Sequence, residues 1–156
     1  MKLDIQDVPA RRVAYLRGYG RYPDVFPKLW PQFSQIAASL KLLGRGKPVL
    51  SVMHDDMNSV PAERVRGDAA VEVSDNWKPT GELQVQTIPA GLYAVFELVG
   101  PYDQLAKTWG KFVKEAAAAD QYRVRSAASY EIYLNDPRTT PPAELRTAMY
   151  LPVEKK

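Results

Sequence analysis

The sequence has 156 residues, no cysteine and a single histidine, His54. Without cysteine, the chain can form neither a disulfide framework nor a thiolate metal site. One histidine also argues against a conventional zinc site, which needs several ligands, and against a serine–histidine triad, which needs histidine beside a nucleophile. We therefore expect no metal and no cofactor. The absence of cysteine agrees with a cytoplasmic location.

Long hydrophobic runs are also missing. No apolar stretch approaches the roughly 18 residues of a membrane-spanning helix. The first residues, MKLDIQDVPARR, lack the apolar core of a secretory signal. These two absences predict a soluble protein that has no membrane partner.

The charged residues show no concentration of one sign. The formal net charge is +3, but the basic residues are dispersed along the chain and interleaved with acids. A DNA-binding face usually collects lysine and arginine on one helix or arm. Since no helix-turn-helix pattern is visible either, we expect no direct binding of nucleic acid.

The chain contains an internal duplication. Residues 4–73 recur as residues 83–153, so that VPARRVAYL reappears as IPAGLYAVF, and Trp30 and Phe33 reappear as Trp109 and Phe112. This repeat predicts a single domain made of two half-repeats, about 1–74 and 82–156, joined by a linker at about 75–81. Duplicated halves usually face each other across a pseudo-twofold axis, which would create a central groove.

Each half has the pattern of a strand, a helix and two further strands. The expected strands cover about 13–17, 49–54 and 67–73 in the first half, and 92–99, 127–134 and 145–153 in the second. One helix is expected over about 24–42, where Pro31 should kink it or delay its regular part. Asp103 can cap the other helix. The predicted fold class is α+β, a tandem βαββ duplication of antiparallel sheets with two helices packed behind.

One carboxylate has no counterpart in the duplicate half. Strand alternation places Glu131 and Tyr133 on the same side of their strand, and the repeat aligns Glu131 with Ser51. Burying an unpaired carboxylate costs several kcal/mol. Three explanations remain open: Glu131 faces solvent on an edge strand, it pairs with an arginine or with tyrosine hydroxyls as part of the structure, or it contacts a cationic ligand in the groove.

Several motifs together resemble the GyrI-like family, also described as the effector-binding domain of AraC-type and MerR-type regulators. They are VPARRVAYLRGYG, SVPAERVRGD and SYEIYLNDP, the last followed by TPPAELRTAMYLPV. The resemblance covers nearly the whole chain and implies a stand-alone version without the usual DNA-binding domain. It also implies a pseudo-symmetric pair of βαββ units, a central ligand groove, cationic or aromatic ligands, and Glu131 as the acid that contacts them.

The predicted ligand site combines this acid with aromatic side chains. Tyrosine rings can supply stacking and cation–π contacts worth about 0.5 to 2 kcal/mol each. Trp109 is either a core residue or part of the wall of the groove. Trp77 in the linker either holds the two halves together as a peg or covers the ligand as a lid. The full predicted set is Glu131, Tyr15, Tyr93, Tyr133, Tyr150, Trp77 and Trp109.

These features predict a small-molecule-binding protein that senses or sequesters a toxic cationic or aromatic compound, with a link to transcriptional regulation. One alternative, implied by the resemblance, is a hydrolase of DNA-alkylating cyclopropane compounds with Glu131 and Tyr133 as catalytic groups. Another is a DNA gyrase inhibitor that binds gyrase as a protein partner, which the net positive charge disfavours. His54 opens a polar turn and is expected to be exposed, with no role in a site.

Overall fold

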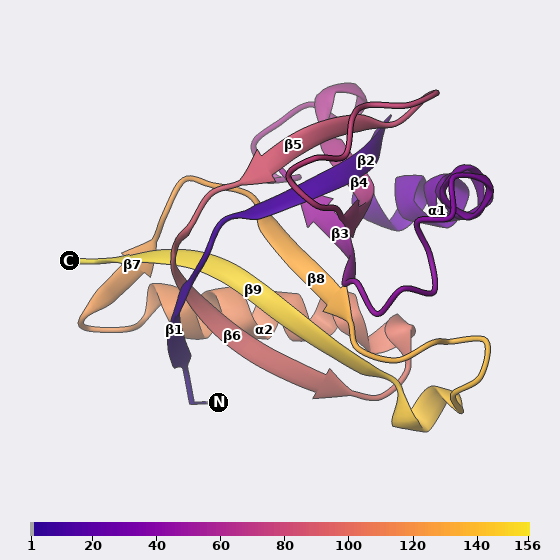
Figure 1. The fold of residues 1–156 in the computed structure, drawn as a ribbon. Helices are drawn as coiled ribbons and strands as arrows, with labels where there is room; N and C mark the ends of the chain where they lie inside the picture. The colour runs from indigo at the N-terminus through magenta and orange to yellow at the C-terminus, as the bar shows by residue number, and fades with distance from the viewer. Residues whose placement is uncertain (1) are drawn as a thin grey trace. The chain divides into compact units, whose positions relative to one another are not determined.

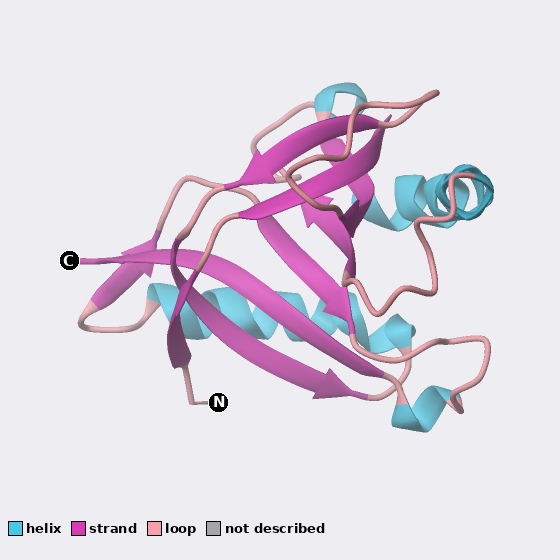
Figure 2. Cartoon of the chain, viewed as in Figure 1, coloured by secondary structure: helices cyan, strands magenta, loops and turns pink. Residues whose placement is uncertain are grey.

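A computed structural model describes residues 2–156, which form nine β-strands, two α-helices and three short 3₁₀ helices. The named strands that pair within each unit are all antiparallel, so the fold is α+β as predicted (Figures 1 and 2). The chain divides into two compact units. Unit 1 contains the residues up to Pro9 together with residues 90–156, and unit 2 contains residues 10–89.

Unit 2 is a four-stranded antiparallel sheet with one helix. Its strand order is β3-β4-β2-β5. The elements are β2 (Arg11–Tyr19), α1 (Tyr22–Ser39), β3 (Val49–Met53), β4 (Arg66–Glu72) and β5 (Gln84–Ile88).

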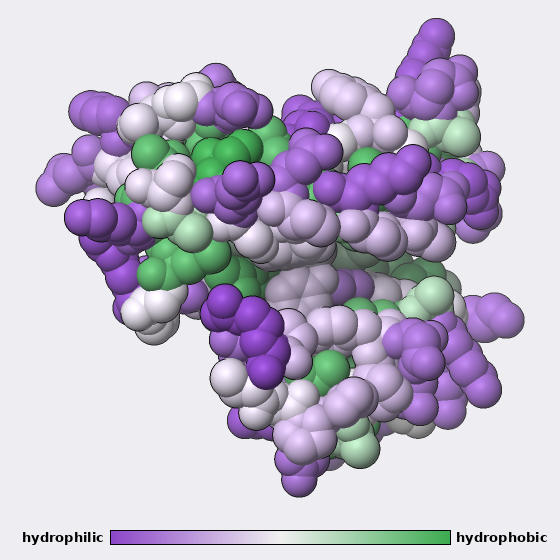
Figure 3. Space-filling view, turned by 90° about the vertical axis from the view of Figure 1, so that its right-hand side faces the viewer, coloured by the Kyte–Doolittle hydropathy of each residue, from purple (hydrophilic) through white to green (hydrophobic). Residues whose placement is uncertain are grey.

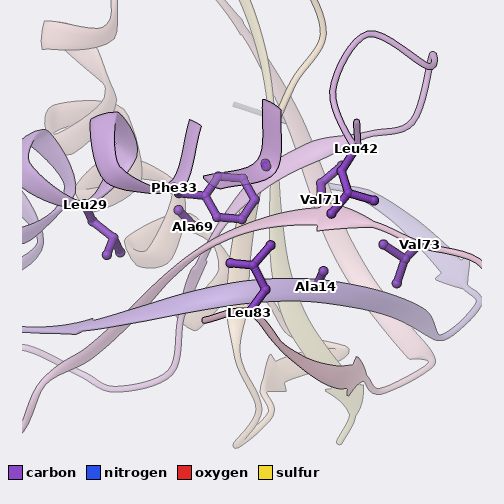
Figure 4. Packing of buried hydrophobic residues seen from close by; sticks show 9 residues of the cluster. Ala14, Leu29, Phe33, Leu42, Ala69, Val71, Val73 and Leu83 are labelled. Carbon is purple, nitrogen blue, oxygen red and sulfur yellow. The ribbon is translucent and has the colours of Figure 1, made fainter. Parts of the chain in front are cut away.

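The core of unit 2 forms where α1 packs on one face of this sheet. Leu29 and Phe33 of the helix belong to the same buried cluster as Ala14, Val71 and Leu83 (Figure 4). The two helix residues are four positions apart, and Ala14 and Val71 are register partners on neighbouring strands, so the helical and strand periodicities meet at this interface.

Unit 1 has the same plan with one additional strand. Four strands follow the order β1-β6-β9-β8, and β7 pairs with the C-terminal part of β9. The elements are β1 (Asp4–Val8), β6 (Gly91–Val99), α2 (Leu105–Ala117), β7 (Tyr122–Val124), β8 (Ser129–Tyr133) and β9 (Arg146–Lys155).

The core of unit 1 lies between α2 and the sheet that this helix covers (Figure 1). Phe112 and Ala116 of the helix are buried against Ala94 of β6 and against Met149 and Leu151 of β9. The predicted strand–helix–strand–strand order is therefore present in both units.

Three strands were not predicted, namely β1, β5 and β7. β1 and β5 have the sequences DIQDV and QVQTI, which expose mainly polar side chains and carry a weak strand signal. β5 pairs with β2 inside unit 2, and β1 pairs with β6 inside unit 1. The compact units therefore change at Pro9–Ala10 and Pro89–Ala90, the dipeptide that the repeat duplicates. The division into half-repeats at 1–74 and 82–156 stays a prediction.

The two helices begin differently from the prediction. α1 is continuous from Tyr22 through Pro27 and Pro31, so the predicted delay of its regular part is wrong. Pro23, Pro27 and Pro31 are four residues apart and exposed, which leaves the freed carbonyls accessible to water. Asp103 does not cap α2: it lies in the 3₁₀ helix Tyr102–Gln104, and no side-chain cap bond precedes Leu105.

Among residues 2–156, no helix is both long and apolar enough to cross a membrane. The longest helix, α1, has 18 residues and buries only three of them, Leu29, Phe33 and Ala37. The face drawn in Figure 3 shows hydrophilic residues around patches of hydrophobic ones.

Candidate functional site

A buried carboxylate on β8 is the centre of the candidate site. This residue, Glu131, is only 7% exposed. Glu131 pairs with Met149 of β9, whose side chain is part of the cluster under α2, so the carboxylate lies on the helix-covered face of the sheet. No arginine, lysine or histidine of the described chain forms an ion pair with it.

Two neutral groups donate hydrogen bonds to this carboxylate. Trp109 Nε1 of α2 donates to Oε1 at 2.8 Å, and the Tyr133 hydroxyl donates to Oε2 at 2.6 Å. Burial raises the pKa of Glu131, and the bonds from Tyr133 and Trp109 oppose that rise only in part. Burial therefore disfavours the ionised form of Glu131 relative to a carboxyl in water, and a positive charge that enters the site would counter this effect.

Tyr102 extends the aromatic surroundings of the acid. Its ring centroid is 5.4 Å from that of Tyr133. Burial raises the pKa of Tyr102, with smaller contributions from the charges of Asp136 and Glu131. Tyr102 was not among the predicted site residues. The signal that could have found it is the repeat, which matches it with Tyr22 at the start of the other helix.

The duplicate half has the same donor and a different acceptor. In unit 2, Trp30 Nε1 donates to the hydroxyl of Ser51 at 2.8 Å, just as Trp109 donates to Glu131 in unit 1. The geometry thus agrees with the repeat alignment of Ser51 with Glu131. Because Ser51 carries no charge, only unit 1 places a carboxylate at this position.

Tyr93 and Tyr150 do not surround Glu131, which corrects the predicted cage. Tyr150 pairs with Tyr130, one residue before Glu131, so both tyrosines point to the opposite face of the sheet. There the Tyr130 and Tyr150 rings stack at 4.6 Å, and the Tyr93 ring meets Tyr130 edge-on at 5.5 Å. The cause is the strand register, which sequence alternation alone does not fix.

The remaining predicted residues, Tyr15 and Trp77, belong to unit 2. The Tyr15 ring lies under the guanidinium of Arg17, with 5.1 Å between Cζ and the ring centroid. Trp77 is half-buried and packs against the hydrophobic cluster of unit 2, and its role as a peg between the halves or as a lid stays a prediction. The structure thus joins Glu131, Tyr133 and Trp109 in one arrangement, and their part in ligand binding stays a prediction.

A second buried acid was missed. Asp68 on β4 is fully buried and accepts hydrogen bonds from Arg17, from Gln86 Nε2 at 2.7 Å and from His54, whose Nε2 lies 2.6 Å away. The expectation that His54 is exposed is wrong, because its side chain is only 16% exposed. Burial by itself would raise the pKa of Asp68, but the bonds from His54, Arg17 and Gln86 outweigh it and lower the pKa.

Asp68 forms a saturated structural network. Its register partner on the neighbouring strand is Arg17, so the pairing of β2 with β4 brings the two charges together. Within residues 2–156, no group of three or more histidine, cysteine, aspartate or glutamate side chains is arranged to hold a metal ion. The acid with neutral partners, Glu131, is therefore the stronger candidate for a ligand site.

The chain matches a family of small-molecule-binding domains. The model of the GyrI-like family, described as a GyrI-like small molecule binding domain, matches residues 1–154. The chain belongs to the GyrI-like family. Among curated relatives, it is 31% identical over 142 residues to a protein of Yersinia enterocolitica named DNA gyrase inhibitor, covering 88% of this chain and 89% of that one.

Solved structures show the same fold at lower sequence identity. The C-terminal domain of EcmrR matches with a TM-score of 0.77 and 20% identity, covering 99% of this chain and 98% of that one. This chain spans 58% of the EcmrR chain that was solved in complex with DNA. SAV2435, solved with bound tetraphenylphosphonium, matches with a TM-score of 0.69 and 16% identity, covering 99% of this chain and 94% of that one.

Proposed function

We propose that this small-molecule-binding domain binds a hydrophobic organic cation, with Glu131 as the anionic contact. The observation that carries the proposal is a buried carboxylate whose hydrogen-bond donors, Trp109 and Tyr133, are both neutral. Among the described residues it has no cationic partner. A cation placed beside it would supply the missing charge in a site from which water is largely excluded.

The aromatic side chains suit the same class of ligand. Trp109, Tyr133 and Tyr102 lie at or next to the carboxylate, and aromatic faces attract cations with about 0.5 to 2 kcal/mol per contact. The structurally similar SAV2435 was solved with tetraphenylphosphonium, a cation of this class, which supports the choice of ligand.

The test compares the binding of tetraphenylphosphonium to the parent and to Glu131→Gln. Tryptophan fluorescence and calorimetry measure the two affinities. Glutamine keeps the size of the side chain and removes the charge, so we expect the affinity to fall by about tenfold or more. Glu144→Gln is the matched control, because Glu144 is exposed in a 3₁₀ helix of the same unit. Equal affinities of Glu131→Gln and the parent would rule out the carboxylate as the anchor.

In this proposal, ligand binding serves to sense or sequester a toxic compound and is linked to transcriptional regulation. A cell that lacks the protein is then expected to be more sensitive to hydrophobic cations, and only the parent, not Glu131→Gln, restores resistance. Equal rescue by both would argue against a role for the site in the cell.

DNA gyrase inhibition is a second candidate, because the Yersinia relative named DNA gyrase inhibitor is 31% identical along most of both chains. Against it stands the formal net charge of +3, which does not suit mimicry of DNA. A supercoiling assay with purified gyrase decides the matter: inhibition that persists in Glu131→Gln would assign the activity to a protein surface outside the ligand site.

Hydrolysis of a DNA-alkylating cyclopropane compound is a third candidate, favoured by the 2.6 Å contact between Tyr133 and Glu131. Glu131 would position the attacking water or accept its proton while the water oxygen bonds to a cyclopropane carbon. The ring carbon–carbon bond would break, its electron pair would pass to an oxygen conjugated with the ring, and the Tyr133 hydroxyl would donate to that developing oxyanion. Incubation with such a compound, with products separated by chromatography, is expected to show no turnover if the domain only binds. Turnover that is lost in Tyr133→Phe would identify an enzyme.

A further inference from the structure

We propose that unit 1 carries a second ligand site, for an amphiphilic organic anion, in the hollow between β6 and α2. This proposal is independent of the function proposed for Glu131. The hollow has a volume of about 380 Å³, within the range of small-molecule sites. Its lining residues are Phe96, Leu98, Gln104, Lys107, Thr108 and Lys111.

The lining combines an apolar floor with a basic rim. Phe96 and Leu98 are half-buried on β6 and offer hydrophobic surface, while Lys107 and Lys111 are exposed on α2, one helical turn apart. The lining contains no carboxylate, and in residues 2–156 neither lysine forms an ion pair. An aromatic or aliphatic body with one anionic group matches this surface in both polarity and charge.

The edge of the sheet leaves this hollow open. The pairing of β1 with β6 runs from Val8↔Gly91 to Asp4↔Val95. Residues 96–99 of β6 therefore have no strand beside them on the β1 side within the part of the chain that is described. Phe96 and Leu98 consequently lie beyond the end of β1, which does not cover them at the edge of the sheet.

The duplicate position in unit 2 is closed, which makes the hollow a specific feature of unit 1. The repeat matches Leu98 with Gly18 and Gln104 with Val25. A Cβ added to Gly18 would lie 2.6 Å from Val25 Cγ2, so α1 rests directly on β2 there. A side chain such as that of Leu98 is incompatible with such a close approach, so the contact between Gly18 and Val25 has no equivalent at Leu98 in unit 1.

The two sites of unit 1 lie on different sides of α2. Residues of a helix advance by about 100° each, so Trp109, which bonds to Glu131, lies about 160° around the helix axis from both Lys107 and Lys111. One side of the helix thus faces a buried acid and the other carries two free lysines above an apolar floor. Ligands of opposite charge are expected to occupy them without competition.

The experiment uses 8-anilinonaphthalene-1-sulfonate, a fluorescent aromatic anion, with the full chain. We expect saturable binding with a blue-shifted emission, about tenfold weaker in Lys107→Glu/Lys111→Glu, because two attractions become repulsions. Lys28→Glu/Lys114→Glu is the matched control with the same change in net charge, since both of its lysines are exposed on helices outside the lining. Far-UV circular dichroism confirms that all variants are folded.

Amide chemical shifts locate the probe. Perturbations centred on Phe96, Leu98 and Thr108, together with unchanged affinity in Glu131→Gln, support the proposal. Equal weakening by the two double variants, absence of saturable binding, or displacement of the probe by tetraphenylphosphonium would overturn it. None of these results depends on whether Glu131 binds a cation.

Discussion

At the scale of the residue, Glu131 illustrates how one difference between duplicate halves places a buried carboxylate in only one of them. Trp30 and Trp109 donate the same hydrogen bond, yet the acceptor is a hydroxyl in one unit and a carboxylate in the other. A serine hydroxyl tolerates burial once it is bonded, whereas an ionised carboxylate with neutral partners does not. The burial of this acid therefore disfavours its ionised form, and the proposed cationic ligand would offset that cost.

The free energy of unfolding is expected to reflect this charge. Burial raises the pKa of Glu131 above its value in the unfolded chain, so the folded state holds the proton more tightly. The contribution of Glu131 to stability is therefore present at low pH and is lost as the pH rises from about 4.3, the ordinary pKa of glutamate, through the raised pKa.

Glu131→Gln should not lose this stability. Urea unfolding from pH 4 to pH 9 is expected to show a steeper decline for the parent than for the variant, with the variant more stable at the alkaline end. Parallel curves for the two proteins would mean that Glu131 ionises in the folded state as easily as in the unfolded state.

At the scale of the element, Asp68 joins three strands of unit 2. It lies on β4 and receives donors from Arg17 of β2 and Gln86 of β5, and also from His54, which directly follows β3. The equivalent position in unit 1 is Ala148, so the two sheets are stabilised by different means. In unit 2 a saturated polar network fixes the strand register.

Asp68→Asn is expected to destabilise the protein by about 3 kcal/mol, because it leaves Arg17 without its buried counter-charge. Urea unfolding at pH 7 measures the loss, and Glu63→Gln, an exposed carboxylate in the same unit, is the control. Since the pKa of Asp68 is lowered, the difference between parent and variant should shrink as the pH falls below about 4 and through that lowered pKa. A difference of the same size at pH 2 would contradict this explanation.

At the scale of the whole molecule, the compact units do not coincide with the sequence repeats. β1 comes before β2 in the chain but pairs with β6, which belongs to the second half of the sequence. β5 also belongs to the second half, and it pairs with β2 of the first half. Each unit therefore receives one edge strand from the other half of the sequence. Leu83, just before β5, is fully buried in the cluster of unit 2.

A fragment of residues 10–89 is consequently expected to retain more native structure than a fragment of residues 1–74. The shorter fragment lacks Leu83 and all five residue pairs between β5 and β2. Circular dichroism and the cooperativity of thermal unfolding compare the two. Equal cooperativity of the fragments would show that the edge strand is dispensable and would favour the sequence-repeat boundaries.

The sequence by itself determined the duplication, the family, most strands and both helices, and the lone carboxylate. These features are carried by local periodicity and by residues such as Trp30 and Trp109 that recur at a fixed interval. Helix α1 was predicted to within a few residues even though it contains three prolines.

Only the tertiary structure decided the remaining features: the edge strands β1 and β5, the Asp68 network, the hollow beside Leu98, and the face on which Glu131 lies. Each depends on register or distance between segments far apart in the chain. A shift of one residue in the pairing of β8 with β9 would have placed Glu131 beside Tyr150 instead of under Trp109, and no local pattern selects between the two.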